Sequence, residues 1–108
     1  MRISYTFRNM ESSDGIKNYA SEKIGKVQKY MRAPLHAEFT FSTERHLHRV
    51  DLNLTGDGRQ YAGHGQSEDM YATIDQVVDK IDRQVRDTKA TQTQRRRNSG
   101  ESLRRPED

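Results

Sequence analysis

The segment of residues 44–52, ERHLHRVDL, carries two histidines separated by one residue, His46 and His48. This spacing is compatible with part of a metal site, the base of a catalytic pair, or the charged tip of a hairpin. Residues i and i+2 of a strand point the same way, so both imidazoles could face one side. A structural zinc needs more ligands, and no spacing makes His64 or Glu44 converge with them. We favour a hairpin tip whose side chains, with Arg45 and Arg49, lie in water or meet phosphate.

The alternative is a metal- or small-ligand-binding protein that uses His46, His48 and His64. Cysteine is absent from the chain, which excludes disulfides, thiolate catalysis and cysteine zinc sites. The sequence also lacks the local signature of a nucleophile with its base, and GHG at residues 63–65 is not a dinucleotide-binding fingerprint. We therefore expect a protein that is not an enzyme and has no cofactor and no metal.

The chain has 108 residues, enough for one domain, and its net charge of +3 indicates a polyanionic partner only if the bases cluster. No apolar run approaches the length that a bilayer requires, and the N-terminal residues lack the apolar core of a signal peptide. We expect a cytoplasmic protein without a membrane partner.

The first half of the chain predicts a strand, a helix and a second strand. Residues 1–9 alternate apolar and polar side chains, as a strand with one buried face does. Ser13 is a plausible N-cap for a helix that ends before Pro34. A two-residue period then returns from Leu35. The helix has an apolar stripe at three- and four-residue spacing: Ile16, Ala20, Ile24, Val27 and Met31.

The second half predicts two more strands and a longer helix. Asp57-Gly58 marks a tight turn between strands, and Gly63 and Gly65 of the last strand would let a helix approach the sheet closely. Ser67 is the predicted cap of the second helix, with Glu68 and Asp69 in its first turn. The stripe of this helix comprises Met70, Ile74, Val77, Val78, Ile81 and Val85.

The predicted fold is an α+β, two-layer β-α-β-β-β-α sandwich, with a four-stranded, largely antiparallel sheet and both helices on one face. The domain spans residues 1–91. Residues 92–108 contain almost no apolar side chain, so we predict a disordered basic tail. The aromatic residues Tyr5, Phe7, Phe39 and Phe41 share the register of the buried face, which indicates core and not base stacking.

Positive charge is unevenly distributed along the chain. Residues 17–32 carry five bases and one acid, and the second half of the last helix carries four bases. Because the two helices should lie side by side, their bases could form one surface that follows a phosphate backbone.

Residues 68–89, EDMYATIDQVVDKIDRQVRDTK, strongly resemble the bacterial ribosome hibernation-promoting factor family, which includes the ribosome-associated inhibitor called protein Y. A weaker likeness runs through SSDGIKNYASEKIGKVQKYM and HLHRVDLNL, so the resemblance covers about residues 1–90. It implies the same fold, which is related to double-stranded-RNA-binding domains. It also implies binding to the small ribosomal subunit, in the messenger RNA path and the aminoacyl and peptidyl tRNA sites. Translation would be silenced there in stationary phase or stress.

The resemblance implies a set of ribosomal RNA contacts in this chain, to which we add Arg45 and His48 of the hairpin and Arg86 of the second helix. Gly25 is a departure that should weaken the first helix by up to about 1 kcal/mol, and Asp87 lies where many relatives keep a base. The chain lacks the C-terminal dimerisation domain of the long form, so it is similar to a short form or a fragment of a long one. Whether ribosome dimers form is left open by the sequence. The full predicted set is Lys23, Lys26, Lys29, Arg45, His48, Asp69, Tyr71, Lys80, Arg83, Arg86 and Lys89.

Overall fold

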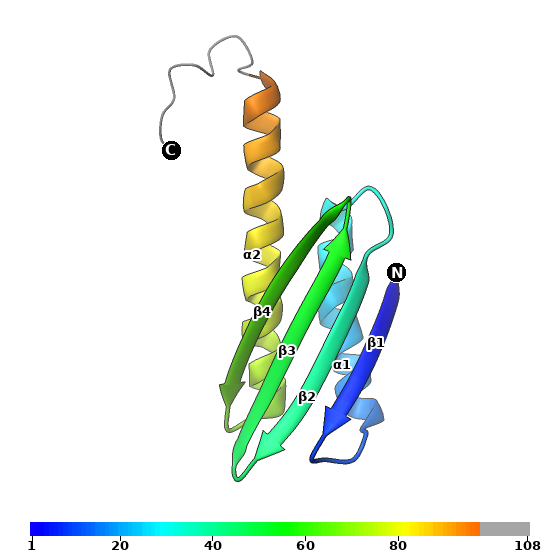
Figure 1. Cartoon of the computed structure of the whole chain (residues 1–108), viewed down its shortest axis with the longest axis vertical. Coiled ribbons are helices and arrows are strands. Elements are labelled where there is room, and N and C mark those ends of the chain that lie inside the picture. Colours follow the sequence, from blue (N-terminus) through cyan, green and yellow to red (C-terminus); the bar gives the residue numbers. More distant parts are fainter. Residues whose placement is uncertain (98–108) are drawn as a thin grey trace.

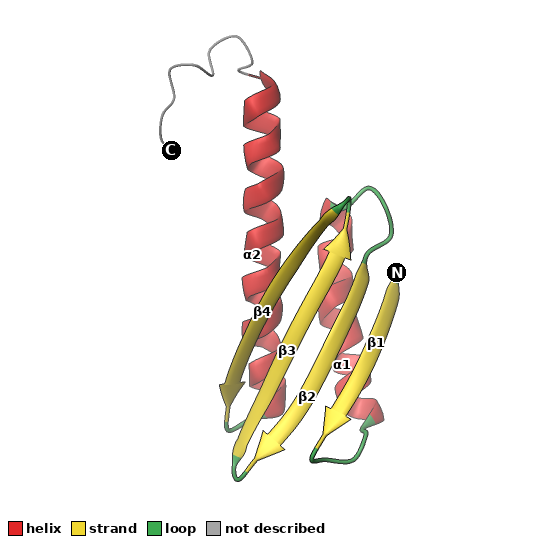
Figure 2. Cartoon of the chain, in the orientation of Figure 1, coloured by secondary structure: helices red, strands yellow, loops and turns green. Residues whose placement is uncertain are grey.

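The computed structural model describes the backbone of residues 1–97 and the side chains of residues 1–90. Its strands form one sheet in the order β1-β2-β3-β4, with β1 parallel to β2 and the other neighbours antiparallel. Both helices cover the same face of this sheet (Figures 1 and 2). The predicted two-layer α+β sandwich is confirmed. The elements are β1 (Arg2–Arg8), α1 (Asp14–Gly25), η1 (Lys26–Tyr30), β2 (His36–Glu44), β3 (Leu47–Gly56), β4 (Arg59–Ser67) and α2 (Met70–Arg97).

The core lies between the sheet and the helices. Phe39 and Phe41 of β2 are almost fully buried, with stacked rings 5.5 Å apart. Tyr5 and Phe7 of β1 are partly buried against the same cluster, and the ring of Phe7 stacks on that of Phe41 at 5.0 Å. The prediction that these four aromatics serve the core is therefore confirmed.

The first helix is shorter than predicted. It begins as expected, because Ser13 Oγ accepts a hydrogen bond from Ile16 N at 3.2 Å. The α-helix ends at Gly25, and residues Lys26–Tyr30 continue as the 3-10 helix η1. Glycine is a poor helix former, which explains why the tighter turn starts there. The predicted stripe is nevertheless buried throughout, including Val27 in η1 and Met31 after it.

The cap of α2 is Asp69 and not Ser67, which corrects the prediction by two residues. Asp69 Oδ1 accepts a hydrogen bond from Tyr71 N at 3.1 Å, as an N-cap side chain does. Ser67 remains the last residue of β4, where its Oγ accepts a hydrogen bond from Asp69 N at 3.2 Å. Glu68 and Asp69 therefore precede the helix instead of forming its first turn.

The other end of α2 lies beyond the predicted domain boundary at residue 91. The helix continues to Arg97, through six residues where we predicted the start of a disordered tail, and it projects past the end of the sheet (Figure 1). The remainder of the predicted tail, residues 98–108, lies outside the described residues.

Glycines of β4 allow α2 to approach the sheet, as predicted. A Cβ atom at Gly65 would lie 3.2 Å from the Val77 side chain and 3.1 Å from that of Gln76. At Gly63 it would lie 3.5 Å from the side chain of Ile81. All six predicted stripe residues of α2 are buried against this surface. Within the described part of the chain, no helix is long and apolar enough to cross a membrane.

Replacing Ile81 by Ala should lower the free energy of unfolding by about 2–5 kcal/mol, because this buried side chain leaves a cavity between α2 and β4. Urea denaturation measures the change. Asp79→Ala, on the exposed side of the same helix, is the control and should change the free energy by less than about 0.5 kcal/mol. A loss below about 1 kcal/mol for Ile81→Ala would contradict the packing of α2 on β4 described above.

Candidate nucleic-acid interface

The excess of positive charge in the helical layer belongs to α1 and η1. Residues 14–32 carry five bases and two acids, whereas residues 70–90 of α2 carry four bases and four acids. The bases and acids of α2 balance, so the predicted contribution of α2 to the basic surface depends on which of its bases are already paired within the protein. The structure assigns different surroundings to each.

Lys23 belongs to a network that joins the two helices. Tyr19 Oη of α1 donates hydrogen bonds to both carboxylate oxygens of Asp75 in α2, at 2.8 and 3.0 Å. Lys23 Nζ lies 3.5 Å from Asp75 Oδ1 and 5.3 Å from the centre of the Tyr19 ring. The hydrogen bond to Asp75 raises the pKa of Tyr19, and the charge of Asp75 raises the pKa of Lys23. Part of the Lys23 charge is therefore already compensated within the protein.

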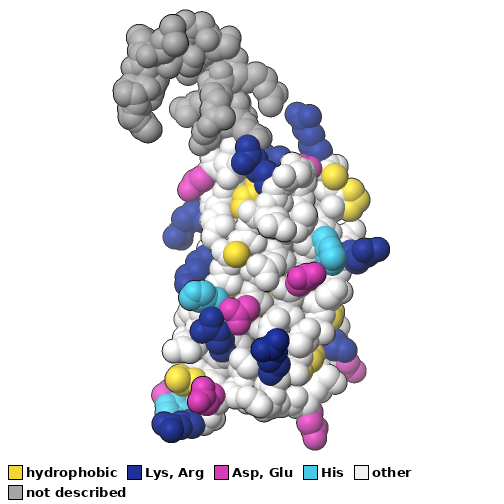
Figure 3. Space-filling view, viewed as in Figure 1, with side chains coloured by type: hydrophobic (Ala, Val, Ile, Leu, Met, Phe, Trp, Pro, Cys, Tyr) yellow, Lys and Arg dark blue, Asp and Glu magenta, His cyan; other side chains and the backbone are white. Residues whose placement is uncertain are grey.

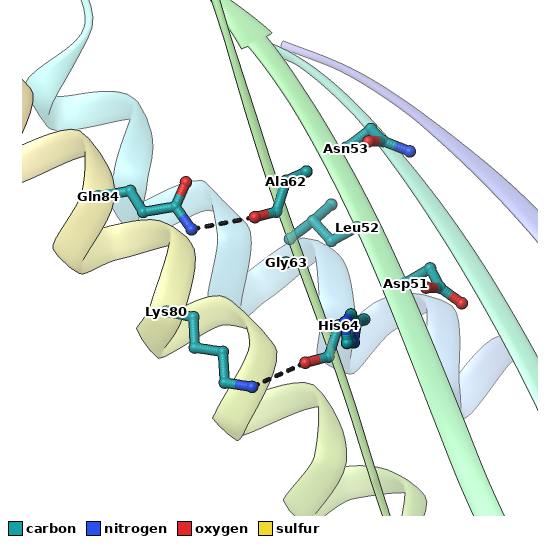
Figure 4. A pocket seen from close by; sticks show the side chains of 8 residues that line it. All are labelled: Asp51, Leu52, Asn53, Ala62, Gly63, His64, Lys80 and Gln84. Carbon is teal, nitrogen blue, oxygen red and sulfur yellow. Dashed lines mark hydrogen bonds between the residues drawn. The ribbon is translucent and has the colours of Figure 1, made fainter.

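Lys80 lies against the edge of the sheet. Its Nζ donates a hydrogen bond to the carbonyl oxygen of His64 at 2.8 Å, and Gln84 Nε2 donates one to that of Ala62 at 3.0 Å (Figure 4). Because β4 is an edge strand, these carbonyls have no neighbouring strand to bond. Lys80 thus contributes to closing the sheet edge as well as to surface charge.

Lys89 forms an ion pair with an acid of the β3–β4 turn. Its Nζ lies 2.5 Å from Asp57 Oδ2, and both side chains are largely buried. The same carboxylate accepts hydrogen bonds from Arg32 N and from Ala33 N in the segment between η1 and β2. The hydrogen bond to Lys89 and the two backbone N–H groups lower the pKa of Asp57 well below its ordinary range. Lys89 is thereby withdrawn from the free surface.

Besides Lys80, four of the predicted cations are exposed and form no ion pair among the described residues. Three of them, Lys26 and Lys29 of η1 and Arg83 of α2, belong to the helical layer, and the fourth is Arg45 of the hairpin tip. Arg86 is also exposed, but its Nε lies 3.0 Å from Asp82 Oδ2 one turn earlier. Together with the exposed Arg32 just after η1, which was not in the predicted set, these side chains remain available for an external anion.

The favoured hairpin tip is confirmed, and the alternative in which His46 and His48 face the same side is wrong in its geometry. The hairpin tip is the turn of Arg45 and His46, and β3 begins only at Leu47, so His46 is not in the strand. His46 Nε2 lies 3.6 Å from Glu68 Oε2 outside the sheet. His48 shares the register of the buried Val50, on the helix-facing side, and its Nδ1 is buried without a hydrogen-bond partner among the described residues.

His64 lies on the opposite face of the sheet from His48, because Gly63 and Gly65 beside it in β4 face α2. The three imidazoles therefore do not converge, which removes the geometric basis of the alternative metal- or ligand-binding function. Within residues 1–90, no group of three or more potential ligands is arranged to hold a metal ion.

The remaining predicted contacts are Asp69, Tyr71 and Arg45. Asp69 is engaged as the cap of α2, and a carboxylate would repel phosphate. Tyr71 is 42% exposed, with its ring edge-on to Tyr19 at 5.0 Å. Arg45 is exposed at the hairpin tip in the left-handed region, with φ at 61°.

The open face of the sheet lacks a comparable basic surface. Figure 3 shows that Lys and Arg side chains on this face are scattered among Asp, Glu and His, and that most of it consists of other side chains and backbone. Arg49, for example, donates two hydrogen bonds to the Asp51 carboxylate at 3.0 and 3.1 Å. Arg2 and Arg8 on this face also form no ion pair among the described residues, but they lie at opposite ends of β1 and are not clustered.

Sequence reasoning missed the role of Asp57. We interpreted Asp57-Gly58 as a turn, which is confirmed by φ values of 53° and 77°. Nothing in the sequence relates this turn to Lys89, 32 residues further on, or to the N–H groups of Arg32 and Ala33. The network of Tyr19, Lys23 and Asp75 was missed for the same reason.

The fold and these side chains define a class: a two-layer α+β domain with a group of unpaired cations on its helical layer. Residues 3–93 match the family model described as "Sigma 54 modulation protein / S30EA ribosomal protein". The chain belongs to this family, which consists of ribosome-associated proteins and not of enzymes.

Named relatives agree with this assignment. The ribosome hibernation promoting factor of Azotobacter vinelandii is 25% identical over 95 residues, covering 88% of this chain and 89% of the relative. That of Escherichia coli K12 is 26% identical over 85 residues, covering 79% and 90%. The ribosome hibernation promotion factor of Lactococcus lactis is 30% identical over 95 residues, which cover 84% of this chain and 51% of the relative.

Solved structures show the same fold. The N-terminal domain of Thermus thermophilus Protein Y aligns with a TM-score of 0.76 at 28% identity, covering 79% of this chain and 96% of that domain. A ribosomal subunit interface protein from Coxiella burnetii aligns with a TM-score of 0.72 at 21% identity, covering 83% and 99%.

The stabilising effect of Asp57 should depend on pH in a defined direction. Because its pKa is lowered in the folded protein, its contribution is complete above the unfolded value near 3.8 and is lost as the pH falls toward the folded value. The difference in unfolding free energy between the parent and Asp57→Asn should therefore be largest at neutral pH and shrink below about pH 4. Denaturant titrations between pH 3 and 7 measure it. Asp79→Asn, on the exposed side of α2, is the control, and a difference for Asp57→Asn that stays constant with pH would contradict the ion pair.

Proposed function

We propose that this protein is a ribosome hibernation factor that binds the small ribosomal subunit through ribosomal RNA and silences translation. The observation that carries the proposal is the set of exposed, unpaired cations on the helical layer, Lys26, Lys29 and Arg83. Phosphate contacts of this kind provide affinity without sequence specificity. The names of the relatives support the same biological role.

The site is proposed to be the messenger RNA path and the aminoacyl and peptidyl tRNA sites, with action in the cytoplasm in stationary phase or stress. A compact domain that occupies this path would exclude messenger and transfer RNA by volume, so no catalytic step is needed. The resemblance of residues 68–89 supports this location. Pairing of the inactive ribosomes is a further outcome that sedimentation would reveal.

The proposed contacts differ in role according to their surroundings. Lys26, Lys29 and Arg83 are the primary phosphate contacts. Lys23 and Arg86 are secondary, because Asp75 and Asp82 already lie beside them. Lys80 and Lys89 act mainly through the fold, Arg45 and Tyr71 are peripheral contacts, and His48 and Asp69 have structural roles.

A variant with Lys26, Lys29 and Arg83 all replaced by Gln should bind the small subunit less tightly and inhibit translation less. Each lost phosphate contact should reduce the slope of log affinity against log salt by about 0.7–0.9, so three contacts reduce it by about 2–3. Co-sedimentation with small subunits at several salt concentrations measures affinity and slope, and an in vitro translation assay measures inhibition. Circular dichroism should show an intact fold, because exposed charges contribute little to stability.

The matched control replaces Arg2, Arg8 and Arg49 by Gln. It removes the same formal charge from the open face of the sheet and should retain most of the affinity. If it weakens binding as much as the helical-layer variant does, net charge determines binding and the proposed surface is wrong. A parent protein that neither binds small subunits nor inhibits translation would overturn the proposed function itself.

A further inference from the structure

Asp57 is an acid placed at a corner of the molecule that is otherwise rich in cations. We call the side chains of Lys26, Lys29 and Arg32, in η1 and just after it, the basic corner. The backbone N–H groups of Arg32 and of the following Ala33 contact the Asp57 carboxylate directly. Oδ1 accepts hydrogen bonds from Ala33 N at 2.9 Å and Arg32 N at 3.2 Å, and Oδ2 accepts one from Arg32 N at 3.1 Å.

The segment between η1 and β2 depends on side chains for its hydrogen bonds. Met31 N ends η1 by donating to the carbonyl oxygen of Gln28 at 2.9 Å. The Gln28 side chain then donates to the Ala33 carbonyl at 3.0 Å and accepts from Leu35 N at 2.9 Å. The N–H groups of Arg32 and Ala33 are satisfied by Asp57, which lies 24 or 25 residues away in sequence. Without the carboxylate, these two donors would lose the contact that holds the segment against the β3–β4 turn.

Asp57 also connects this corner to α2. Lys89 Nζ lies 2.5 Å from Oδ2, and the Asp57 side chain is only 13% exposed. Its negative charge is therefore surrounded by one ammonium group and two backbone N–H groups. A charge so compensated adds little repulsion toward a phosphate outside.

The turn geometry alone does not require aspartate. The φ of Asp57 is 53°, a conformation that Asn also adopts readily. Asn could retain the turn and part of the backbone hydrogen bonding, but it has no charge for Lys89 and only one acceptor oxygen. The carboxylate at this position is therefore needed to connect the β3–β4 turn with the segment after η1 and with α2.

We propose that Asp57 is a positioning residue for RNA binding. It holds the end of η1, the following segment and α2 together, so that Lys29 and Arg32 are presented in a fixed arrangement to phosphates. The inference rests on the proposed function and adds to it an acid that strengthens the binding of a polyanion.

This role predicts an effect opposite to that of net charge. Removing a negative charge from an RNA-binding protein normally tightens binding. Asp57→Asn should instead weaken binding to small subunits about tenfold, because ordering of the freed cations must then accompany binding. Asp79→Asn removes the same charge from the exposed side of α2, where no described residue forms an ion pair with it, and should leave affinity unchanged or up to about threefold tighter.

The experiment measures the affinity of the full chain for purified small subunits at a temperature where circular dichroism shows every variant to be folded. Val77→Ala, which is destabilised in the core far from the corner, controls for loss of stability and should bind like the parent. Hydrogen exchange at the amides of Arg32 and Ala33 should accelerate in Asp57→Asn and not in Asp79→Asn. In a background with Lys29 and Arg32 replaced by Gln, Asp57→Asn should change affinity by less than about twofold, because its effect passes through those cations.

Binding of Asp57→Asn as tight as that of Asp79→Asn would overturn the inference and leave the proposed function intact. An undiminished tenfold loss in the Lys29 and Arg32 background would also overturn it, since Asp57 would then act elsewhere. Failure of the parent to bind small subunits would overturn the proposed function and this inference together.

Discussion

The close packing of α2 on β4 is the constraint on which the rest of the structure depends. A side chain at Gly65 would meet Val77 and Gln76, and one at Gly63 would meet Ile81, so these two positions determine how near the helix lies to the sheet. That proximity brings Lys80 and Gln84 within hydrogen-bonding distance of the β4 edge carbonyls. It also places Asp75 beside Tyr19 and Lys23 of α1, and Lys89 beside the β3–β4 turn. The packing of α2 on β4 thus determines which bases of α2 form hydrogen bonds or ion pairs within the protein.

Several bases of the helical layer are paired within the protein, so the structure differs from two helices that simply expose a row of bases. Lys23, Lys80 and Lys89 each have a partner within the protein, at Asp75, the His64 carbonyl and Asp57 respectively. The acids of α2 accordingly do not oppose binding uniformly, because some of them orient bases or connect elements. Lys26, Lys29 and Arg83 form no ion pair with another described residue, so their charge is left for an external phosphate.

The sequence predicted the fold better than the site because the two depend on different kinds of information. Apolar periodicity is local, so the strands, both stripes and the close approach at Gly63 and Gly65 could be predicted and are confirmed. The predicted N-cap of α2, Ser67, lies two residues before the observed one, Asp69. Both residue types are good caps, and the position where β4 ends determines which of them caps the helix. Gly25 indicated a weak point in the first helix, but not that the next five residues would continue as a 3-10 helix. The pairing of Asp57 with Lys89 joins segments far apart in sequence, which no local pattern encodes.

The same distinction explains why the histidine pair was misleading. Side chains two residues apart point to the same side only when both residues belong to a strand. Here β3 begins at Leu47, after His46. The tight turn of Arg45 and His46 therefore separates the two imidazoles, with one outside near Glu68 and the other on the helix-facing side. At the opposite end of β3, the turn of Asp57 and Gly58 bends back toward η1 and α2. The two ends of one strand thus differ in kind: one is an exposed tip, and the other is a junction that organises the cations around it.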